Sequence, residues 1–275
     1  MAILYKDKEE DGFYDEYASG RSNDKGIKGE KLVSDAMITG LSDSFTLLND
    51  VYVRTQEGGY TEIDHILLHE KFIVCIETKN ISGELIPIDE ETWEKVNFNG
   101  ESTLIDSPQQ QSLHHAISLK RFLKEHKISS YVFAFVVLVN PKASSFNKEA
   151  DTFYLQECPV IYKNELIHFI KYIESQLENS ATIQQQHIAE LIIDEHEGIK
   201  QSALFWCKKL ATHENDPEAQ YQLGKMYMMG YFEEDNRLIK VIQNERAALY
   251  WYGKAKRQGH ALARKDLQLY YKNNR

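Results

Sequence analysis

The chain has 275 residues, with 42 Asp and Glu against 32 Lys and Arg, which gives a formal net charge of −10. This length allows one or two domains with their own hydrophobic cores. The acidic balance argues against tight, nonspecific nucleic-acid binding over the whole surface. The N-terminus lacks the apolar run of a signal peptide, and no segment approaches the roughly 20 apolar residues that span a bilayer. We therefore expect a cytoplasmic protein with no membrane partner.

The cysteines and the charges refine this expectation. Cys75, Cys158 and Cys207 have no CxxC spacing and no nearby His pattern, so we interpret them as reduced core residues rather than zinc ligands. Residues 1–175 carry a net charge of −11 and residues 176–275 a net charge of +1. One local basic strip interrupts the acidic part, and it consists of Lys120, Arg121, Lys124 and Lys127. We favour reading this strip as the solvated face of a helix, with contact to a phosphate backbone as the alternative.

The first part of the chain predicts a helix followed by strands. Residues 1–25 are acidic and aromatic, and we expect a helical or loose lead-in there. Residues 27–42 have helical periodicity, and residues 45–53 suit a strand. Gly58-Gly59 indicates a turn. The two apolar runs that follow, residues 60–68 and 72–79, are expected to pair as strands.

The middle of the chain continues this mixed pattern. Residues 84–88 and 93–98 suggest a hairpin or edge strands. A helix is predicted over residues 110–126, because Pro108 suits a helix start. Residues 131–139 are β-branched and aromatic throughout, as in a central strand buried on both faces. The order of these elements fits an α/β sandwich.

Helices are expected over residues 166–177 and 183–199, with a domain boundary near residue 178. Beyond them the segment Ala203–Lys209 recurs as Ala248–Lys254, 45 residues later, and each copy is followed by an Ala-x-x-x-Leu helix. This pattern resembles the Sel-like repeat, a relative of the tetratricopeptide repeat, over about residues 200–272. The resemblance implies α/α hairpins that offer a face to a protein partner or to a second copy of the chain.

The tripeptide Glu77-Thr78-Lys79 carries the chemistry. Side chains alternate along a strand, so Glu77 and Lys79 point the same way. If the two apolar runs pair as strands, Asp64 reaches the same point. Two carboxylates can hold Mg²⁺, and an ammonium group can lie near an attacking water. A solvated strand face is the alternative for an isolated Glu-x-Lys.

Four motifs in order resemble the nuclease-related domain, NERD, of the PD-(D/E)xK nuclease superfamily, over about residues 26–140. They are Gly26 to Glu30, Ile63-Asp64-His65, Glu77 to Gly83, and Ser107-Pro108-Gln109-Gln110-Gln111, in which Ser107 replaces the usual Asn. The resemblance implies a restriction-endonuclease-like α/β/α nuclease core. We expect this core to be followed by an all-α helical-repeat domain, with divisions at 1–25, 26–178 and 179–275.

The same resemblance implies a role for each site residue. Asp64 and Glu77 would bind the metal, with Glu30 and the Thr78 carbonyl as further ligands. Lys79 would orient the attacking water, and Gln111 would help to position water, metal or substrate. The metal would be Mg²⁺, for which Mn²⁺ can substitute.

Two functions follow from these patterns. The first is a metal-dependent endonuclease acting on nucleic acid, with DNA expected from the superfamily. Its repeat module would bind a protein partner or form a homo-oligomer, and prokaryotic defence against phage is a setting that suits the domain type. The second is a partner-recruiting scaffold whose nuclease site is silent or needs activation. The intact set of Asp64, Glu77 and Lys79 favours the first.

Overall fold

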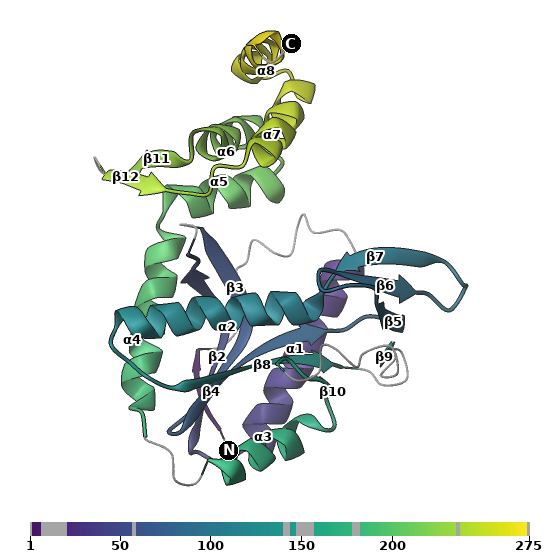
Figure 1. Ribbon diagram of the computed structural model, residues 1–275, viewed down its shortest axis with the longest axis vertical. Helices are drawn as coiled ribbons and strands as arrows, with labels where there is room; N and C mark the ends of the chain where they lie inside the picture. The colour runs from purple at the N-terminus through teal and green to yellow at the C-terminus, as the bar shows by residue number, and fades with distance from the viewer. Residues whose placement is uncertain are drawn as a thin grey trace. The chain divides into compact units, whose positions relative to one another are not determined.

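The computed structural model describes residues 2–6, 21–56, 59–139, 144–146, 157–177, 182–234 and 237–273 (Figure 1). The chain divides into two compact units. Among the described residues, the first unit holds residues 2–6, 21–53 and those between 61 and 194. The second holds the short segment around residues 54–60 and the residues from 195 onward. Within the described residues, each helix is too short or too polar to cross a membrane.

A six-stranded mixed sheet forms the centre of the first unit, with the strand order β1-β2-β3-β4-β8-β10. The predicted strand pair is present, because β3 and β4 are antiparallel and His65 pairs with Ile76. β4 then runs parallel to β8, with Glu77 opposite Val136. The strands of this sheet are β1 (Ile3–Lys6), β2 (Phe45–Arg54), β3 (Tyr60–His69), β4 (Phe72–Lys79), β8 (Tyr131–Leu138) and β10 (Val160–Tyr162).

Helices cover both faces of this sheet, as the predicted α/β layers require. Alternate side chains of a strand face opposite sides, so the sheet takes part in two separate cores. One core contains Ile73 and Cys75 of β4 together with α2 (Pro108–Glu125) and the first part of α4 (Gln185–Lys200). The other contains Val74 and Ile76 together with α1 (Arg21–Gly40) and α3 (Leu166–Gln176).

A second, four-stranded sheet connects β4 to α2. Its order is β7-β6-β5-β9, and the strands are β5 (Gly83–Pro87), β6 (Thr92–Val96), β7 (Ser102–Asp106) and β9 (Ser144–Phe146). The sequence predicted the β5–β6 hairpin, but neither β7 nor the parallel pairing of β5 with β9. Trp93 of β6 is fully buried and fixes this sheet on the first core.

Two boundaries differ from the expectations for the ends of this unit. Residues 3–6 of the expected lead-in form the strand β1, while residues 7–20 lie outside the described residues. The expected boundary near residue 178 also falls outside them. Ile188 and Ile192 of α4 are buried in the first core, and the division between the units falls within this helix, after residue 194.

The C-terminal unit is mainly helical. Its helices are α5 (Ala203–Thr212), α6 (Pro217–Met229), α7 (Glu245–Arg257) and α8 (Ala261–Asn273), and each packs on the next. Gly224 of α6 lies against the ring of Tyr252 in α7, where a Cβ atom would come within 2.6 Å of a ring carbon. This close approach suits stacked α/α hairpins, and the Sel-like repeat stays a prediction.

The expectation of an all-α C-terminal domain is wrong in one respect. A β-hairpin, β11 (Tyr231–Glu234) and β12 (Arg237–Lys240), lies between α6 and α7. Gly230 adopts φ 76°, which ends α6 and turns the chain into the hairpin. Phe232 and Val241 are then buried in the core of this unit.

Candidate active site

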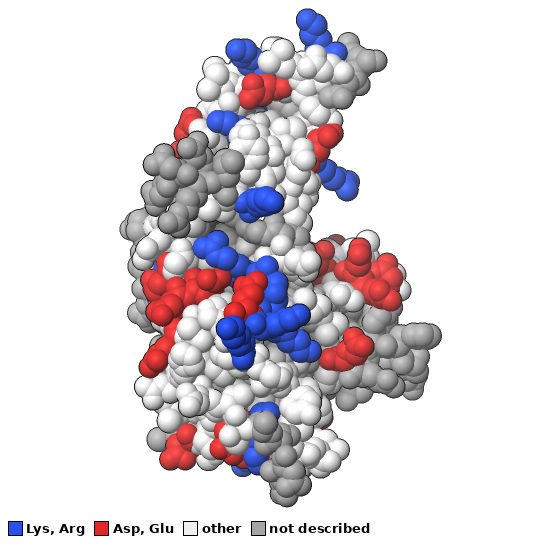
Figure 2. Space-filling model, turned by 60° about the vertical axis from the view of Figure 1, so that its left-hand side comes forward, with Lys and Arg blue, Asp and Glu red and all other residues white. Residues whose placement is uncertain are grey.

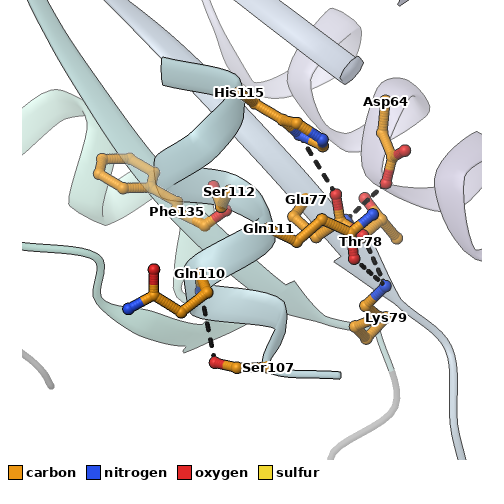
Figure 3. A network of polar contacts seen from close by, with 10 residues as sticks. All are labelled: Asp64, Glu77, Thr78, Lys79, Ser107, Gln110, Gln111, Ser112, His115 and Phe135. Carbon is orange, nitrogen blue, oxygen red and sulfur yellow. Dashed lines mark hydrogen bonds and ion pairs between the residues drawn. The ribbon is translucent and has the colours of Figure 1, made fainter. Parts of the chain in front are cut away.

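The middle of β3 and the end of β4 bring together four of the predicted site residues, Asp64, Glu77, Thr78 and Lys79 (Figure 3). The backbone N–H of Thr78 donates a hydrogen bond of 2.7 Å to Oδ2 of Asp64, which fixes this carboxylate beside the end of β4. Lys79 Nζ donates to Oε1 of Glu77 at 2.6 Å. Glu77 and Lys79 therefore lie on the same side of β4, as the alternation of side chains predicts.

The first turn of α2 adds Gln111 to this group. Lys79 Nζ donates a second hydrogen bond, of 3.1 Å, to Oε1 of Gln111. The turn is held in position by its cap, because Ser107 Oγ accepts the N–H of Gln110 and Pro108 occupies the start of the helix. Ser and Asn are about equally good N-caps, so Ser107 performs the capping role that an Asn would perform in the motif.

Two further contacts fix α2 over the ends of β4 and β8. Ser112 Oγ donates a hydrogen bond of 3.0 Å to the carbonyl of Phe135 in β8. Gln109 Nε2 donates one of 2.6 Å to the carbonyl of Cys158. With these buried anchors on either side of it, Gln111 is exposed and directed toward Lys79.

His115, one turn after Gln111, completes the surroundings of Glu77. Both side chains are 3% exposed, and His115 Nδ1 lies 3.5 Å from Oε2 of Glu77. Neither of these two atoms has a hydrogen-bond partner among the described residues. Burial, reinforced by His114 and Lys79, lowers the pKa of His115 to about 3, so the imidazole is neutral near pH 7. The contact is therefore not an ion pair.

Burial shifts the pKa values of the neighbouring carboxyl groups upward, in the opposite direction to that of His115. Burial raises the pKa of Asp64 well above its ordinary value, and the charges of Glu77 and Glu30 raise it further. Burial also raises the pKa of Glu77, although Lys79 opposes this shift. Negative charge at this point is thus incompletely compensated by Lys79 and the Thr78 N–H. Such clusters of perturbed carboxyl groups are characteristic of functional sites.

Glu30 approaches the site from α1, and two neighbouring contacts explain how. Gly29 packs against Asn80, where a Cβ atom would lie 2.5 Å from Cβ of Asn80. Asn80 Nδ2 in turn donates a hydrogen bond of 2.7 Å to the carbonyl of Lys25. Gly29, the second glycine of the Gly-x-x-Gly-Glu motif, therefore lets α1 lie against Asn80.

The donor set suits a hard divalent cation in its chemistry. Asp64 and Glu77 offer carboxylate oxygens, which Mg²⁺ prefers, and Oε2 of Glu77 is buried without a hydrogen-bond donor among the described residues. A cation would relieve the repulsion that raises both pKa values. Across the described residues, however, no three His, Cys, Asp or Glu side chains are arranged as a ready metal site. Asp64 and Glu77 are thus the two carboxylates here that could hold a cation.

Three histidines among the described residues lie in or near the sequence motifs, and of these only His115 contacts the site. His114 is exposed whereas His115 is buried, as expected for adjacent residues on a helix. His65 is fully buried and its Nδ1 pairs with Oδ1 of Asn49 at 2.7 Å, which makes it a structural residue rather than one at the site edge. The sequence reading did not assign His115 to the site. Its spacing of four residues from Gln111, on a helix covering β4, is the signal that could have done so.

Comparisons with known proteins bear on the same part of the chain. The model of the nuclease-related domain matches residues 25–139. The match covers less than half of the chain and includes all the predicted site residues, and it confirms that a nuclease-related domain lies here. An uncharacterized protein from Bacillus anthracis is 29% identical over 171 residues, which cover 62% of this chain and 76% of the relative. No solved structure matches the chain.

Proposed function

We propose that this protein is a metal-dependent nuclease that hydrolyses the phosphodiester bonds of DNA. The observation that carries the proposal is the partly buried cluster at the end of β4, where Lys79 contacts both Glu77 and Gln111 and where Asp64 is held alongside. The nuclease-related domain over residues 25–139 supports phosphodiester chemistry. DNA as the substrate rests on the resemblance to the PD-(D/E)xK superfamily.

Lys79 is suited to orient the attacking water. Its ammonium group has three N–H donors, of which Glu77 and Gln111 take two among the described residues. The third donor can hold a water or a phosphate oxygen, and the positive charge stabilises the charge that develops on the phosphate. Gln111 restricts the position of the ammonium group, so that this donor has a defined direction.

Asp64 and Glu77 would hold the cation, with the Thr78 carbonyl as a further oxygen and Glu30 contributing directly or through water. Mg²⁺, when bound, supplies positive charge for the scissile phosphate and its leaving oxygen. The Thr78 N–H keeps Oδ2 of Asp64 in place, and buried His115 limits the movement of Glu77. These residues thus pre-organise the carboxylates before any cation arrives.

Cleavage of supercoiled plasmid and of single strands, with Mg²⁺, Mn²⁺ or EDTA, tests the proposal. We expect metal-dependent nicking that Lys79→Ala reduces by about 10²-fold or more. Lys71→Ala is the matched control, because it removes the same charge just before β4 begins and away from the site. Equal loss in the two variants, or no cleavage by folded wild type, would contradict the assignment.

One observation favours the second function, a scaffold whose site is silent until activated. Lys79 Nζ lies against the same carboxylate that would bind the metal, and the described residues hold no ready three-ligand cluster. A partner or substrate would then be needed to draw Lys79 away from Glu77. Binding of nucleic acid without cleavage, under all metal conditions, would identify this function.

The C-terminal helices and the biological setting complete the proposal. Stacked α/α hairpins present an extended face, which suits binding of a protein partner or a second copy of the chain. A cytoplasmic role in prokaryotic defence is consistent with the domain type. Size-exclusion chromatography with light scattering, applied to the full chain, tests the homo-oligomer directly.

A further inference from the structure

One exposed face of α2 is basic along its second half. Lys120, Arg121 and Lys124 follow one another at helical spacing, and Lys127 comes just after the helix ends. We call these four residues the basic ridge. Lys120, Lys124 and Lys127 are exposed, while Leu119, Phe122 and Leu123 between them face the core. Figure 2, which brings this end of α2 forward, has Lys and Arg side chains gathered near the centre of the view.

Three lysines of this ridge form no ion pair within the described residues, although Figure 2 also shows Asp and Glu side chains beside the Lys and Arg side chains. From Pro108 to Lys124 the helix has no acidic residue, and the first is Glu125. Glu125 lies 3.8 Å from Arg121 and forms an ion pair with it one turn along the helix, so the excess charge of the ridge comes from its three lysines. Lys120, Lys124 and Lys127 have no carboxylate within ion-pair distance among the described residues. In a chain with a net charge of −10, this is a concentrated local excess of positive charge.

The opposite end of α2 meets an acidic surface. The segment from Gly83 to Asp106, which forms β5, β6 and β7, contains seven acidic residues and one Lys. It reaches the start of α2 directly, because the N–H of Ser107 donates to the carbonyl of Glu91 at 2.8 Å. The site near Gln111 therefore has carboxylates on one side along α2 and ammonium groups on the other.

Favourable interaction with the helix dipole explains the position of only some basic residues of the ridge. Basic side chains in the last turn of a helix interact favourably with its dipole, and the effect decays within that turn. Lys124 lies in the last turn of α2, which ends at Glu125, but Lys120 and Arg121 precede it. A general solubility role would also be served by either charge sign, whereas α2 carries no acidic residue before Glu125.

We propose that the basic ridge is the track along which the phosphate backbone of the nucleic acid leaves the site, toward the C-terminal end of α2. This inference rests on the proposed function and adds to it the direction of the substrate. The acidic sheet β5–β7 disfavours the backbone on the other side. The exposed side chains of His114 and Ile117 lie between the site and the ridge and carry no negative charge.

The length of the track follows from helix geometry. Gln111 and Lys124 are 13 residues apart, which corresponds to about 20 Å along the helix axis at 1.5 Å per residue. Phosphates of one strand are about 3.4 Å apart along the duplex axis, so the track covers about six nucleotides. Lys120 is nine residues, or about 14 Å, from Gln111, so substrates with fewer than about four nucleotides on the ridge side should bind as weakly as they would without the ridge.

The test compares two triple variants of the full chain that lose the same charge. The ridge variant is Lys120→Gln, Lys124→Gln and Lys127→Gln, and the control variant is Lys31→Gln, Lys163→Gln and Lys171→Gln on α1 and near α3. Binding of a labelled duplex is measured in EDTA, which prevents metal-dependent cleavage, over a range of salt concentrations. All six lysines are at least partly exposed, so both variants should fold, which circular dichroism verifies.

Each phosphate contact contributes about 0.9 to the slope of log affinity against log salt for duplex DNA, so three contacts contribute about 2.7. Between 50 and 200 mM salt the wild type should therefore lose about 40-fold more affinity than the ridge variant. The control variant should keep the wild-type slope. Equal slopes for both variants would overturn the track.

Further outcomes separate the track from the proposed function. If the wild type cleaves DNA and the ridge variant keeps the wild-type salt slope, the track is refuted and the proposed nuclease activity is not. A ridge-dependent slope without cleavage under any metal condition keeps the track and refutes the nuclease. Absence of both binding and cleavage refutes both. Polyglutamate that binds the ridge as tightly as DNA does would also overturn the assignment to nucleic acid.

Discussion

Two glycines of α1, one turn apart, should respond in opposite directions to the same substitution. Gly in a helix costs about 0.5–1 kcal/mol relative to Ala, so propensity alone predicts that both Gly26→Ala and Gly29→Ala stabilise the protein. At Gly26 a Cβ atom would have its nearest neighbour at 3.8 Å, which is an ordinary contact. At Gly29 it would lie 2.5 Å from Cβ of Asn80, about 1 Å too close.

Overpacking of this kind costs about 1–3 kcal/mol. We therefore expect Gly26→Ala to raise the free energy of unfolding by about 0.5–1 kcal/mol and Gly29→Ala to lower it by up to about 2 kcal/mol, after its gain in propensity. Because Glu30 adjoins Gly29, the second variant should also cleave DNA more slowly. Urea denaturation followed by circular dichroism measures both stabilities. Equal stabilisation by the two substitutions would refute the close packing of α1 against Asn80.

Three further substitutions test the site. Asp64→Asn should raise the melting temperature in EDTA, because it removes a buried carboxyl group whose pKa is raised by burial and by neighbouring carboxylates. The same variant should cleave about 10²-fold more slowly or worse. An unchanged melting temperature would contradict the first expectation. The pKa of His115 is lowered to about 3 in the folded protein, whereas in the unfolded chain it is about 6.5. Below about pH 6.5 a proton therefore binds the unfolded chain but not the folded one, so the free energy of unfolding decreases as the pH falls. Between pH 6.5 and 5 the wild type should lose about 2 kcal/mol more than His115→Gln, measured by urea denaturation at each pH. Ser107→Ala should cost about 1 kcal/mol while Ser107→Asn should be nearly neutral, since both Ser and Asn cap a helix; an equal loss in these two variants would argue against the cap.

The part of the site that could be predicted from the sequence is the part fixed by local periodicity. Asp64, Glu77 and Lys79 lie on two consecutive strands joined by a short turn, so alternation alone brings their side chains to one edge. Gln111 could be added because its motif starts a helix. His115 required the rotation of α2 against β4, which depends on buried anchors such as Ser112.

Pairings between distant segments set the limit on predicting the fold. β5 pairs with β9, in which Gly83 is opposite Ser144, and no local pattern indicates such a partner. The hairpin β11–β12 was missed for a different reason. Its strands are only four residues each, and the helix before them ends at Gly230 through a backbone conformation that the sequence allows but does not require.

The proposed track would reconcile the acidic net charge of the protein with binding of a polyanion. At physiological salt, charges more than about 8 Å apart are largely screened, so a phosphate on the ridge interacts mainly with the ridge itself. At about 0.01 M salt the screening length reaches roughly 30 Å, and the phosphate then also interacts with the carboxylates of β5–β7 and of the rest of the unit. The net charge of −10 therefore opposes binding most at low salt, whereas at physiological salt a phosphate on the ridge would be affected mainly by the ridge. The ridge would therefore favour a substrate that follows α2 toward its C-terminal end, because a backbone displaced toward β5–β7 would meet carboxylates.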